Sequence, residues 1–179
     1  MGKPSCRSKE VFGSEKDGSF WQNARQHYLR EVWCIYEWQM RILLDTCIFI
    51  HLATDRDLLS KDVMALLEDY DNTLCVSIET VRELIIQFNK GKLVSKFWKT
   101  SQEIIDSIKN DYFMDVLPLR EEHMRTYSKL RLNTMQGHND PSDHVIISHA
   151  ITEHLPLVSE DGKFAFYKDQ GLDLILNEK

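Results

Sequence analysis

Short apolar runs alternate with longer amphipathic segments over most of the chain. Short runs rich in Leu, Ile and Val are typical of strands, whereas apolar residues three or four positions apart indicate helices. The expected strands are 41–45, 73–77, 113–119, 155–161 and 172–176. The expected helices are 60–71, 77–91, 93–110, 120–135 and one that begins in the stretch "HNDPSDH" at 138–144. This alternation predicts a parallel sheet covered on both faces, a three-layer α/β/α sandwich with about five strands.

The first 39 residues differ from the rest of the chain. Residues 1–19 are polar and rich in Gly, Ser and Lys, which predicts a disordered tail. Residues 20–39 repeat apolar positions at helical spacing, which predicts an amphipathic helix. We therefore expect an N-terminal extension over 1–39 and a single globular domain over 40–179.

The composition limits the classes of function. A formal net charge of −6 excludes a general electrostatic attraction to nucleic acid or to an anionic membrane, so polyanion binding would need a local basic patch or bound cations. The four cysteines form no CxxC pair, which favours a reducing compartment over a disulfide scaffold. No window holds the roughly 18 apolar residues of a membrane span, and no signal peptide is recognisable. These features predict a cytoplasmic protein that does not bind membranes.

Four acidic residues fall where ligands bind in such sheets, beyond the carboxyl ends of the strands. Asp45 follows the first expected strand and Asp161 the fourth, while Glu83 and Asp143 lie in the first turns of two helices. Clustered carboxylates repel one another unless a cation lies between them, and Mg²⁺ or Mn²⁺ suits oxygen ligands. One or two such ions can activate water and stabilise the leaving oxygen in phosphodiester hydrolysis. The joint placement predicts a metal site.

Each acid also has an ordinary interpretation. Asp45 could end a strand, Glu83 could be an exposed helix residue, and Asp161 could form an Asp-Gly turn. In "HNDPSDH", Asp140 precedes a proline that suits the first helical position, so we interpret Asp140 as the N-cap. Asp143 would then be either a capping-box acid or a metal ligand.

Four motifs, "LLDTCIFI", "VSIETVRELI", "NDPSDHVIISHAI" and "LPLVSEDGKF", resemble in order and spacing those of the PIN-domain ribonucleases, above all the VapC-type toxins of bacterial toxin–antitoxin pairs. The resemblance covers residues 40–179. It implies a Mg²⁺- or Mn²⁺-dependent endonuclease that cuts single-stranded RNA or an RNA loop, with an antitoxin as partner and a homodimeric state. The acidic quartet of the family maps onto Asp45, Glu83, Asp143 and Asp161. Its neighbouring hydroxyl residues map onto Thr46 and Ser159, which would orient the carboxylates or water.

The chain departs from the family at three places. Cys47 stands where an Asn is usual, and His144 stands where an Arg is frequent, so any RNA contact of that Arg is in doubt. Residues 1–39 have no counterpart, because the family usually begins at a segment like "MRILLDT". This suggests the hypothesis that Met40 is the natural start, which N-terminal sequencing of the native protein would test.

A basic strip lies between residues 82 and 99, where a single acid accompanies several cations and interleaved aromatics. Such a strip suits phosphates and stacked bases, but it would equally suit a solvated helix face with aromatics in the core. By resemblance this region also helps to form the groove that receives the antitoxin. The candidate RNA-binding residues are Arg82, Lys90, Lys92 and Lys96.

Other chemistries fit the sequence less well. His144, His149 and His154 are spaced by five, which does not stack them for zinc, so we interpret them as solvated or capping residues. A phosphatase of the HAD type would need an acid at the position of Cys47, and a receiver domain would need an acidic pair before the strand-end Asp. A non-catalytic PIN-like module that binds RNA or protein stays open as the alternative.

Overall fold

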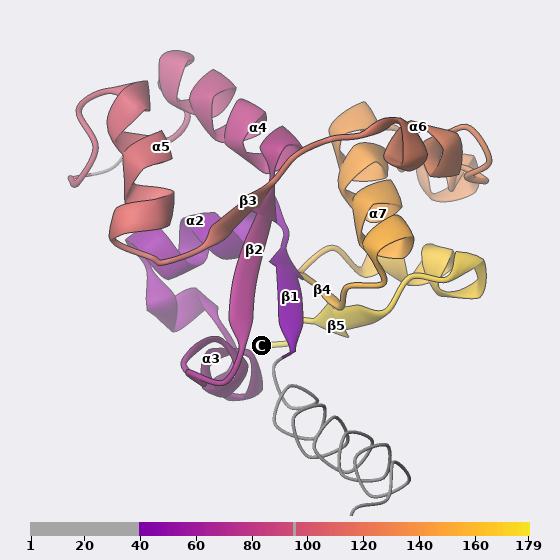
Figure 1. The fold of residues 1–179 in the computed structure, drawn as a ribbon, viewed down its shortest axis with the longest axis horizontal. Coiled ribbons are helices and arrows are strands. Elements are labelled where there is room, and N and C mark those ends of the chain that lie inside the picture. The colour runs from indigo at the N-terminus through magenta and orange to yellow at the C-terminus, as the bar shows by residue number, and fades with distance from the viewer. Residues whose placement is uncertain (1–39, 95) are drawn as a thin grey trace, which may run out of the picture. The chain divides into compact units, whose positions relative to one another are not determined.

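Five parallel strands form one sheet in the computed structural model, which describes residues 40–94 and 96–179 (Figure 1). The strands are β1 (Arg41–Leu44), β2 (Thr73–Ser77), β3 (Asp115–Leu117), β4 (Leu157–Ser159) and β5 (Leu174–Leu176). Their order is β3-β2-β1-β4-β5, so the first strand lies in the middle and all carboxyl ends meet at one edge. All five expected strands are confirmed. The expected N-terminal extension, 1–39, lies outside the described residues.

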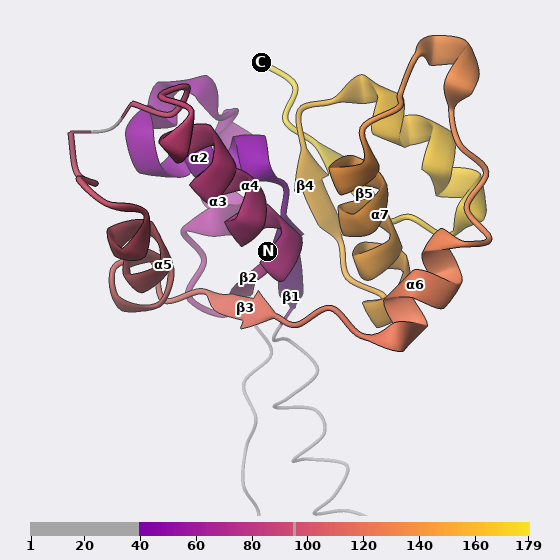
Figure 2. The same cartoon turned by 90° about the horizontal axis from the view of Figure 1, so that it is seen from above.

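Helices cover both faces of the sheet, and the predicted three-layer α/β/α sandwich is confirmed (Figures 1 and 2). The α-helices are α2 (Thr46–Thr54), α3 (Lys61–Leu67), α4 (Ile78–Asn89), α5 (Ser101–Asn110), α6 (Glu121–Tyr127) and α7 (Pro141–Glu153). Three 3₁₀ helices are η1 (Arg56–Leu58), η2 (Thr134–Gln136) and η3 (Gly162–Gln170). No helix in the described part of the chain is long and apolar enough to cross a membrane.

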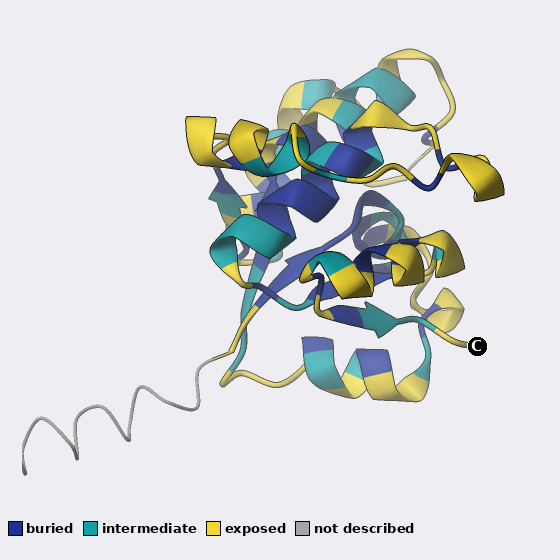
Figure 3. Ribbon diagram, turned by 90° about the vertical axis from the view of Figure 1, so that its right-hand side faces the viewer, coloured by how far each residue is buried: buried dark blue, intermediate teal, exposed yellow. Residues whose placement is uncertain are grey.

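The core has two halves because side chains alternate between the faces of each strand. Ile42 and Leu44 belong to the half that packs against α2, α3, α4 and α5. Leu43 belongs to the other half, together with Ile147 of α7 and Phe164 of η3. All five of these side chains are completely or almost completely buried, and Figure 3 shows the buried residues gathered on the strands and the inner helix faces. Burying such a side chain contributes about 1.5–3 kcal/mol, so both faces need their helices.

Side chains of three polar residues cap the starts of three helices. Ser60 accepts a hydrogen bond from the Val63 backbone N–H at the start of α3, and Ser77 accepts one from the Glu79 N–H at the start of α4. Asp140 accepts one from the Ser142 N–H at the start of α7, with Pro141 at the first helical position. The predicted N-cap role of Asp140 is therefore confirmed.

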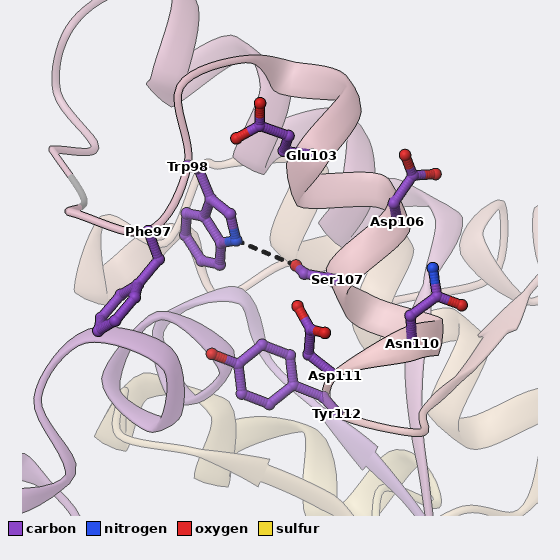
Figure 4. A pocket seen from close by; sticks show the side chains of 8 residues that line it. All are labelled: Phe97, Trp98, Glu103, Asp106, Ser107, Asn110, Asp111 and Tyr112. Atoms are coloured by element: carbon purple, nitrogen blue, oxygen red, sulfur yellow. Dashed lines mark hydrogen bonds between the residues drawn. The ribbon is translucent and has the colours of Figure 1, made fainter.

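The expected helix over 93–110 is wrong at its beginning, because α5 starts only at Ser101. Thr100 caps this helix by accepting a hydrogen bond from the Glu103 N–H. The preceding Trp98 is buried, and its indole N–H donates to Ser107 Oγ at 3.1 Å (Figure 4). This tertiary contact folds the connection back over α5, which helical periodicity alone could not indicate.

Two further helix predictions need correction. The expected helix over 120–135 ends at Tyr127, where Ser128 Oγ donates to the Arg125 carbonyl and competes with the helical hydrogen bonds. The helix α2 was not predicted. Its sequence "TCIFIHLAT" is apolar almost all round and buries Ile48, Phe49 and Leu52, so it lacks the amphipathic period of a surface helix.

The cap at Asp140 gives a prediction about stability. We expect Asp140→Ala to lower the free energy of unfolding by about 1 kcal/mol, because the first turn of α7 loses its acceptor. Asp140→Asn keeps the acceptor and should cost at most a few tenths of a kcal/mol. Urea denaturation of the metal-free protein would measure both changes, and equal losses in the two variants would contradict the capping role.

Candidate functional site

The four acids predicted to converge do line one pocket of about 340 Å³ at the carboxyl edge of the sheet. They reach it from four parts of the chain. Asp45 follows β1 and caps α2, while Glu83 lies in the second turn of α4. Asp143 lies in the first turn of α7, and Asp161 follows β4 and caps η3, where its Oδ1 accepts from the Lys163 N–H at 2.8 Å.

Asp45 is the most deeply held of these carboxylates, with only 5% of its surface exposed. Its Oδ2 accepts hydrogen bonds from Ser159 Oγ at 2.6 Å and from the Cys47 thiol at 3.3 Å. Its Oδ1 accepts from the Thr46 backbone N–H at 2.7 Å. These three donors fix the carboxylate relative to the ends of β1 and β4.

The two predicted orienting hydroxyls each connect two parts of the pocket. Thr46 Oγ1 donates to Glu83 Oε2 and so links the start of α2 to α4. Ser159 Oγ donates to Asp45 and accepts from the Asp161 backbone N–H at 3.1 Å. Each hydroxyl therefore donates to a carboxylate from another segment of the chain.

Burial and mutual repulsion make the carboxylates unfavourable to ionise. Burial, reinforced by Asp45 and other acids, raises the pKa of Asp143 to about 8. Burial is also the largest cause of the raised pKa of Glu83, which Thr46 partly opposes. The pKa of Asp45 is raised by burial as well, although the hydrogen bond from Ser159 partly lowers it. These three acids therefore hold their protons more tightly than free carboxyl groups do.

The donor set of the pocket fits a hard divalent cation. Among residues 40–94 and 96–179, six carboxylates line the pocket, and no Lys or Arg does. Oxygen ligands of this kind suit Mg²⁺ or Mn²⁺, and a cation would offset both the burial and the repulsion that raise the pKa values. The two acids beyond the predicted quartet are Asp140, the cap of α7, and Glu160, whose Oε2 lies 2.8 Å from His51 Nε2.

Asp143 does not act as a capping-box acid. Its Oδ2 lies 3.0 Å from Nε2 of His138, a buried residue in the connection between η2 and α7. His138 in turn contacts Tyr167 Oη through Nδ1 at 2.9 Å. The sequence analysis singled out neither His138 nor Tyr167, and no spacing signal in the chain indicates that they meet.

Two of the three departures from the family pattern, Cys47 and His144, lie in the described part of the chain, and both are next to residues of the pocket. Cys47 donates its thiol hydrogen to Asp45, and burial raises the pKa of the thiol, so it stays protonated. His144 is fully buried and its ring lies 4.9 Å from that of His138, centroid to centroid. A side chain in this place cannot contact RNA at the surface.

The predicted basic strip is only partly available to a ligand. Arg82 donates two hydrogen bonds to Glu79 and one to Ser142 Oγ at 2.8 Å, which ties α4 to the start of α7. Lys90, Lys92 and Lys96 are exposed. Of the interleaved aromatics, Phe88 packs against the core and Trp98 is buried, whereas Phe97 is 71% exposed.

The interpretation of His144 and His149 as solvated or capping residues is wrong, because both are fully buried. His149 lies close to His123 and Glu153, at a spacing that could suggest a second metal site. The Arg120 backbone N–H, however, donates to His123 Nδ1 at 2.8 Å, so the imidazole proton is on Nε2 and points to Glu153 Oε1. Because Nε2 then has no free lone pair, we assign this group to the packing of α6 on α7.

The fold and the pocket define a class of protein, a three-layer α/β domain that gathers carboxylates at the carboxyl edge of a parallel sheet. The chain belongs to the PIN-domain family, whose model matches residues 42–169. This range includes all four predicted acids, and the resemblance inferred from the four motifs is confirmed at the level of the family. No curated protein matches the chain significantly.

Several solved structures of toxin–antitoxin complexes share the fold. The chain is 26% identical to a chain of VapBC-1 from nontypeable Haemophilus influenzae, with 78% of this chain and 100% of that chain covered and a TM-score of 0.55. It is 23% identical to a chain of VapBC2 from Rickettsia felis, solved with promoter DNA, with 78% and 100% covered and a TM-score of 0.59. For DNA-bound VapBC from Salmonella typhimurium, the identity is 17%, the coverage 76% and 98%, and the TM-score 0.56. These similarities agree with the observed architecture.

The raised pKa of Asp143 predicts how stability depends on pH. Between the ordinary pKa of 3.8 and the folded value of about 8, the unfolded state loses this proton first, so rising pH destabilises the metal-free fold. Asp143→Asn removes that cost and keeps an acceptor for His138. We expect the variant to melt several degrees higher than the wild type at pH 8, since 1 kcal/mol corresponds to about 2–4 °C at this size.

Thermal denaturation with EDTA at pH 5 and pH 8 would test this prediction. The advantage of Asp143→Asn should be larger at pH 8. Asp169→Asn, at an exposed position on η3, is the matched control and should shift the Tm little at either pH. A variant that melts at or below the wild-type temperature at pH 8 would show that Asp143 is not electrostatically strained.

Proposed function

We propose that this protein is a Mg²⁺- or Mn²⁺-dependent endoribonuclease that hydrolyses phosphodiester bonds of single-stranded RNA. The observation that carries the proposal is the gathering of Asp45, Glu83, Asp143 and Asp161 in a pocket that no Lys or Arg of the described part of the chain lines. Buried carboxylates that repel one another are unfavourable when ionised, and a bound cation would offset their charge. Membership of the PIN-domain family supports the same reaction class.

The residues of the pocket have separable tasks in this mechanism. A bound divalent ion would activate water and stabilise the leaving oxygen of the phosphodiester. The four carboxylates would hold the ion, and Asp45 would be the most rigid ligand because three donors fix it. Thr46 and Ser159 keep Glu83 and Asp45 in place by hydrogen bonds, so the ligands are preorganised.

We further propose that the protein is the toxin of a toxin–antitoxin pair and acts in the cytoplasm. The support is the structural similarity to chains of VapBC complexes. This chain is 26% identical to the matched chain of the Haemophilus influenzae complex. The expected partners are a cognate antitoxin, a second copy of the chain in a homodimer, and single-stranded RNA or an RNA loop. The rival function, a non-catalytic PIN-like module that binds RNA or protein, does not account for the complete set of four acids.

Substitution of the acids tests the proposed reaction. We expect Asp45→Asn and Asp143→Asn to keep the fold, to lower cleavage of a single-stranded RNA pool at least about 100-fold, and to relieve growth arrest on expression, because the ion loses a charged ligand. Asp140→Asn is the matched control and should retain most of the activity. EDTA should abolish wild-type cleavage, and Mn²⁺ should restore it.

Wild-type cleavage that persists in EDTA would contradict the metal requirement. Wild-type rates in Asp45→Asn or Asp143→Asn with the same metal would contradict the assignment of the site. Tight RNA binding with no cleavage in any divalent metal would favour the non-catalytic module.

The exposed lysines give a separate prediction about RNA binding. We expect replacement of Lys90, Lys92 and Lys96 by Gln to weaken RNA binding and to reduce the slope of log K against log salt by about 2, since each phosphate contact on a single strand contributes about 0.7. Fluorescence anisotropy at salt concentrations from about 50 to about 200 mM would measure the slope. Replacement of Lys61, Lys109 and Lys129, which are equally exposed, is the charge-matched control. An equal loss in both triple variants would mean that only net charge matters.

A further inference from the structure

We infer that His138 is a positioning residue, a neutral imidazole with its proton fixed on Nε2 that holds the Asp143 carboxylate in place for the cation. The inference deepens the proposed function and rests on it, because it assigns a task at the same site. His138 itself would touch neither the ion nor RNA. Its effect would pass entirely through Asp143.

The surroundings of His138 fix the plane of its ring. The residue is 2% exposed and lies in the connection between η2 and α7. The rings of His144, Phe164 and Tyr167 surround it with centroid distances of 4.9, 5.2 and 5.6 Å, all in edge-on arrangements. An imidazole packed in this way cannot turn freely, so the directions of its two nitrogens are set by the fold.

A chain of hydrogen bonds determines which nitrogen carries the proton. The Asn133 backbone N–H, which can only donate, lies 3.3 Å from Tyr167 Oη. Tyr167 Oη therefore accepts there, and its own buried hydroxyl proton needs an acceptor. His138 Nδ1, at 2.9 Å, supplies the acceptor. In a neutral imidazole the proton then has to be on Nε2.

The other end of the chain requires the same arrangement. Asp143 Oδ2 lies 3.0 Å from His138 Nε2. The form of Asp143 that binds a cation is the ionised carboxylate, which can only accept hydrogen bonds. The backbone donor at Asn133 and the acceptor at Asp143 thus specify one direction for all three hydrogen bonds. The contact engages Oδ2 and leaves the second oxygen of the carboxylate for the ion.

Direct ligation by His138 is the alternative, since ligand atoms of His138, Asp143 and Asp161 all lie within 4.8 Å of one another. Ligation through Nε2 would need a lone pair on that atom and a proton on Nδ1. Two donors, the Asn133 N–H and Nδ1–H, would then meet Tyr167 Oη, and the buried phenol proton would lose its acceptor. The cost of an unsatisfied buried donor favours positioning over ligation.

Three variants of the full chain separate these possibilities. His138→Leu removes the hydrogen bond to Asp143, whereas His138→Gln keeps an N–H donor but has no imidazole. Tyr167→Phe leaves the core filled and removes only the hydroxyl that fixes the tautomer. Isothermal titration with Mn²⁺ measures metal affinity, and ¹⁵N NMR of histidine-labelled protein reports which ring nitrogen bears a proton.

Positioning predicts that His138→Leu weakens Mn²⁺ binding about 10–100-fold, as is usual when the partner of a ligand is lost. His138→Gln should stay within about threefold of the wild type, a rescue that a mere loss of packing would not produce. The wild type should show a directly bonded proton on Nε2 and none on Nδ1. Tyr167→Phe should populate both tautomers and bind Mn²⁺ more weakly.

Three results would overturn the inference. Wild-type Mn²⁺ affinity in His138→Leu would mean that Asp143 needs no support. An equal loss in His138→Gln and His138→Leu would make His138 a ligand, and a proton on Nδ1 in the wild type would contradict the direction of the chain. The NMR measurement needs neither metal nor RNA when it is made at a pH above the pKa of Asp143 (about 8), where this carboxylate is ionised. A failure of the proposed ribonuclease activity would then be recognised separately, because the wild type would show the expected tautomer but no cleavage.

Discussion

The repulsion between carboxylates at one edge of the sheet is the constraint on which the site depends. Each acid is held by neutral donors and not by a cation of the protein, as Asp45 is held by Ser159, Cys47 and the Thr46 backbone. Neutral donors fix an orientation without cancelling the charge. Burial is the largest cause of the raised pKa of Asp143, about 8, and repulsion from the neighbouring acids raises it further. In the proposed function, this accumulated negative charge would give the pocket its affinity for a divalent ion.

The strand order explains why these acids meet at all. β1 lies between β2 and β4, so the segments that follow these three strands begin side by side, about 4.8 Å apart per strand. Asp45 and Asp161 follow two neighbouring strands directly. Glu83 is carried by the helix that follows the third, and α7 brings Asp143 from the other layer. A topology with β1 at the edge of the sheet would separate the ligands, whatever their side chains.

Much of this arrangement could be predicted from the sequence, because the signals involved are local. The strands are continuous apolar runs, and Ser60, Ser77 and Asp140 mark helix starts by their own chemistry. The convergence of the four acids then follows from the rule that parallel strands share a carboxyl edge. α2 could not be recognised, since a helix buried on nearly all sides lacks a polar face. The late start of α5 depends on the tertiary contact between Trp98 and Ser107.

The hydrogen-bonded chain behind Asp143 could not be predicted from the sequence either, because it also depends on tertiary contacts. It joins Asn133, His138 and Tyr167, and Tyr167 lies 29 residues beyond His138. No periodicity relates these positions. They meet because the connection before α7 packs against Phe164 and Tyr167 of η3 in one half of the core. Sequence patterns report which residues face the core, but not which polar atoms find each other there.

A neutral imidazole beside Asp143 differs in its effect from either a charged or an apolar side chain at the same position. An Arg or Lys at the position of His138 would also orient the carboxylate, but its charge would lower the pKa of Asp143 and compete with a divalent ion. An apolar residue would leave the carboxylate free to rotate. A neutral imidazole with a fixed tautomer avoids both outcomes, because it donates one hydrogen bond and adds no charge. In the proposed site, the short stretch "HNDPSDH" would add two tasks to the observed capping of α7 by Asp140: orientation by His138 and ligation by Asp143.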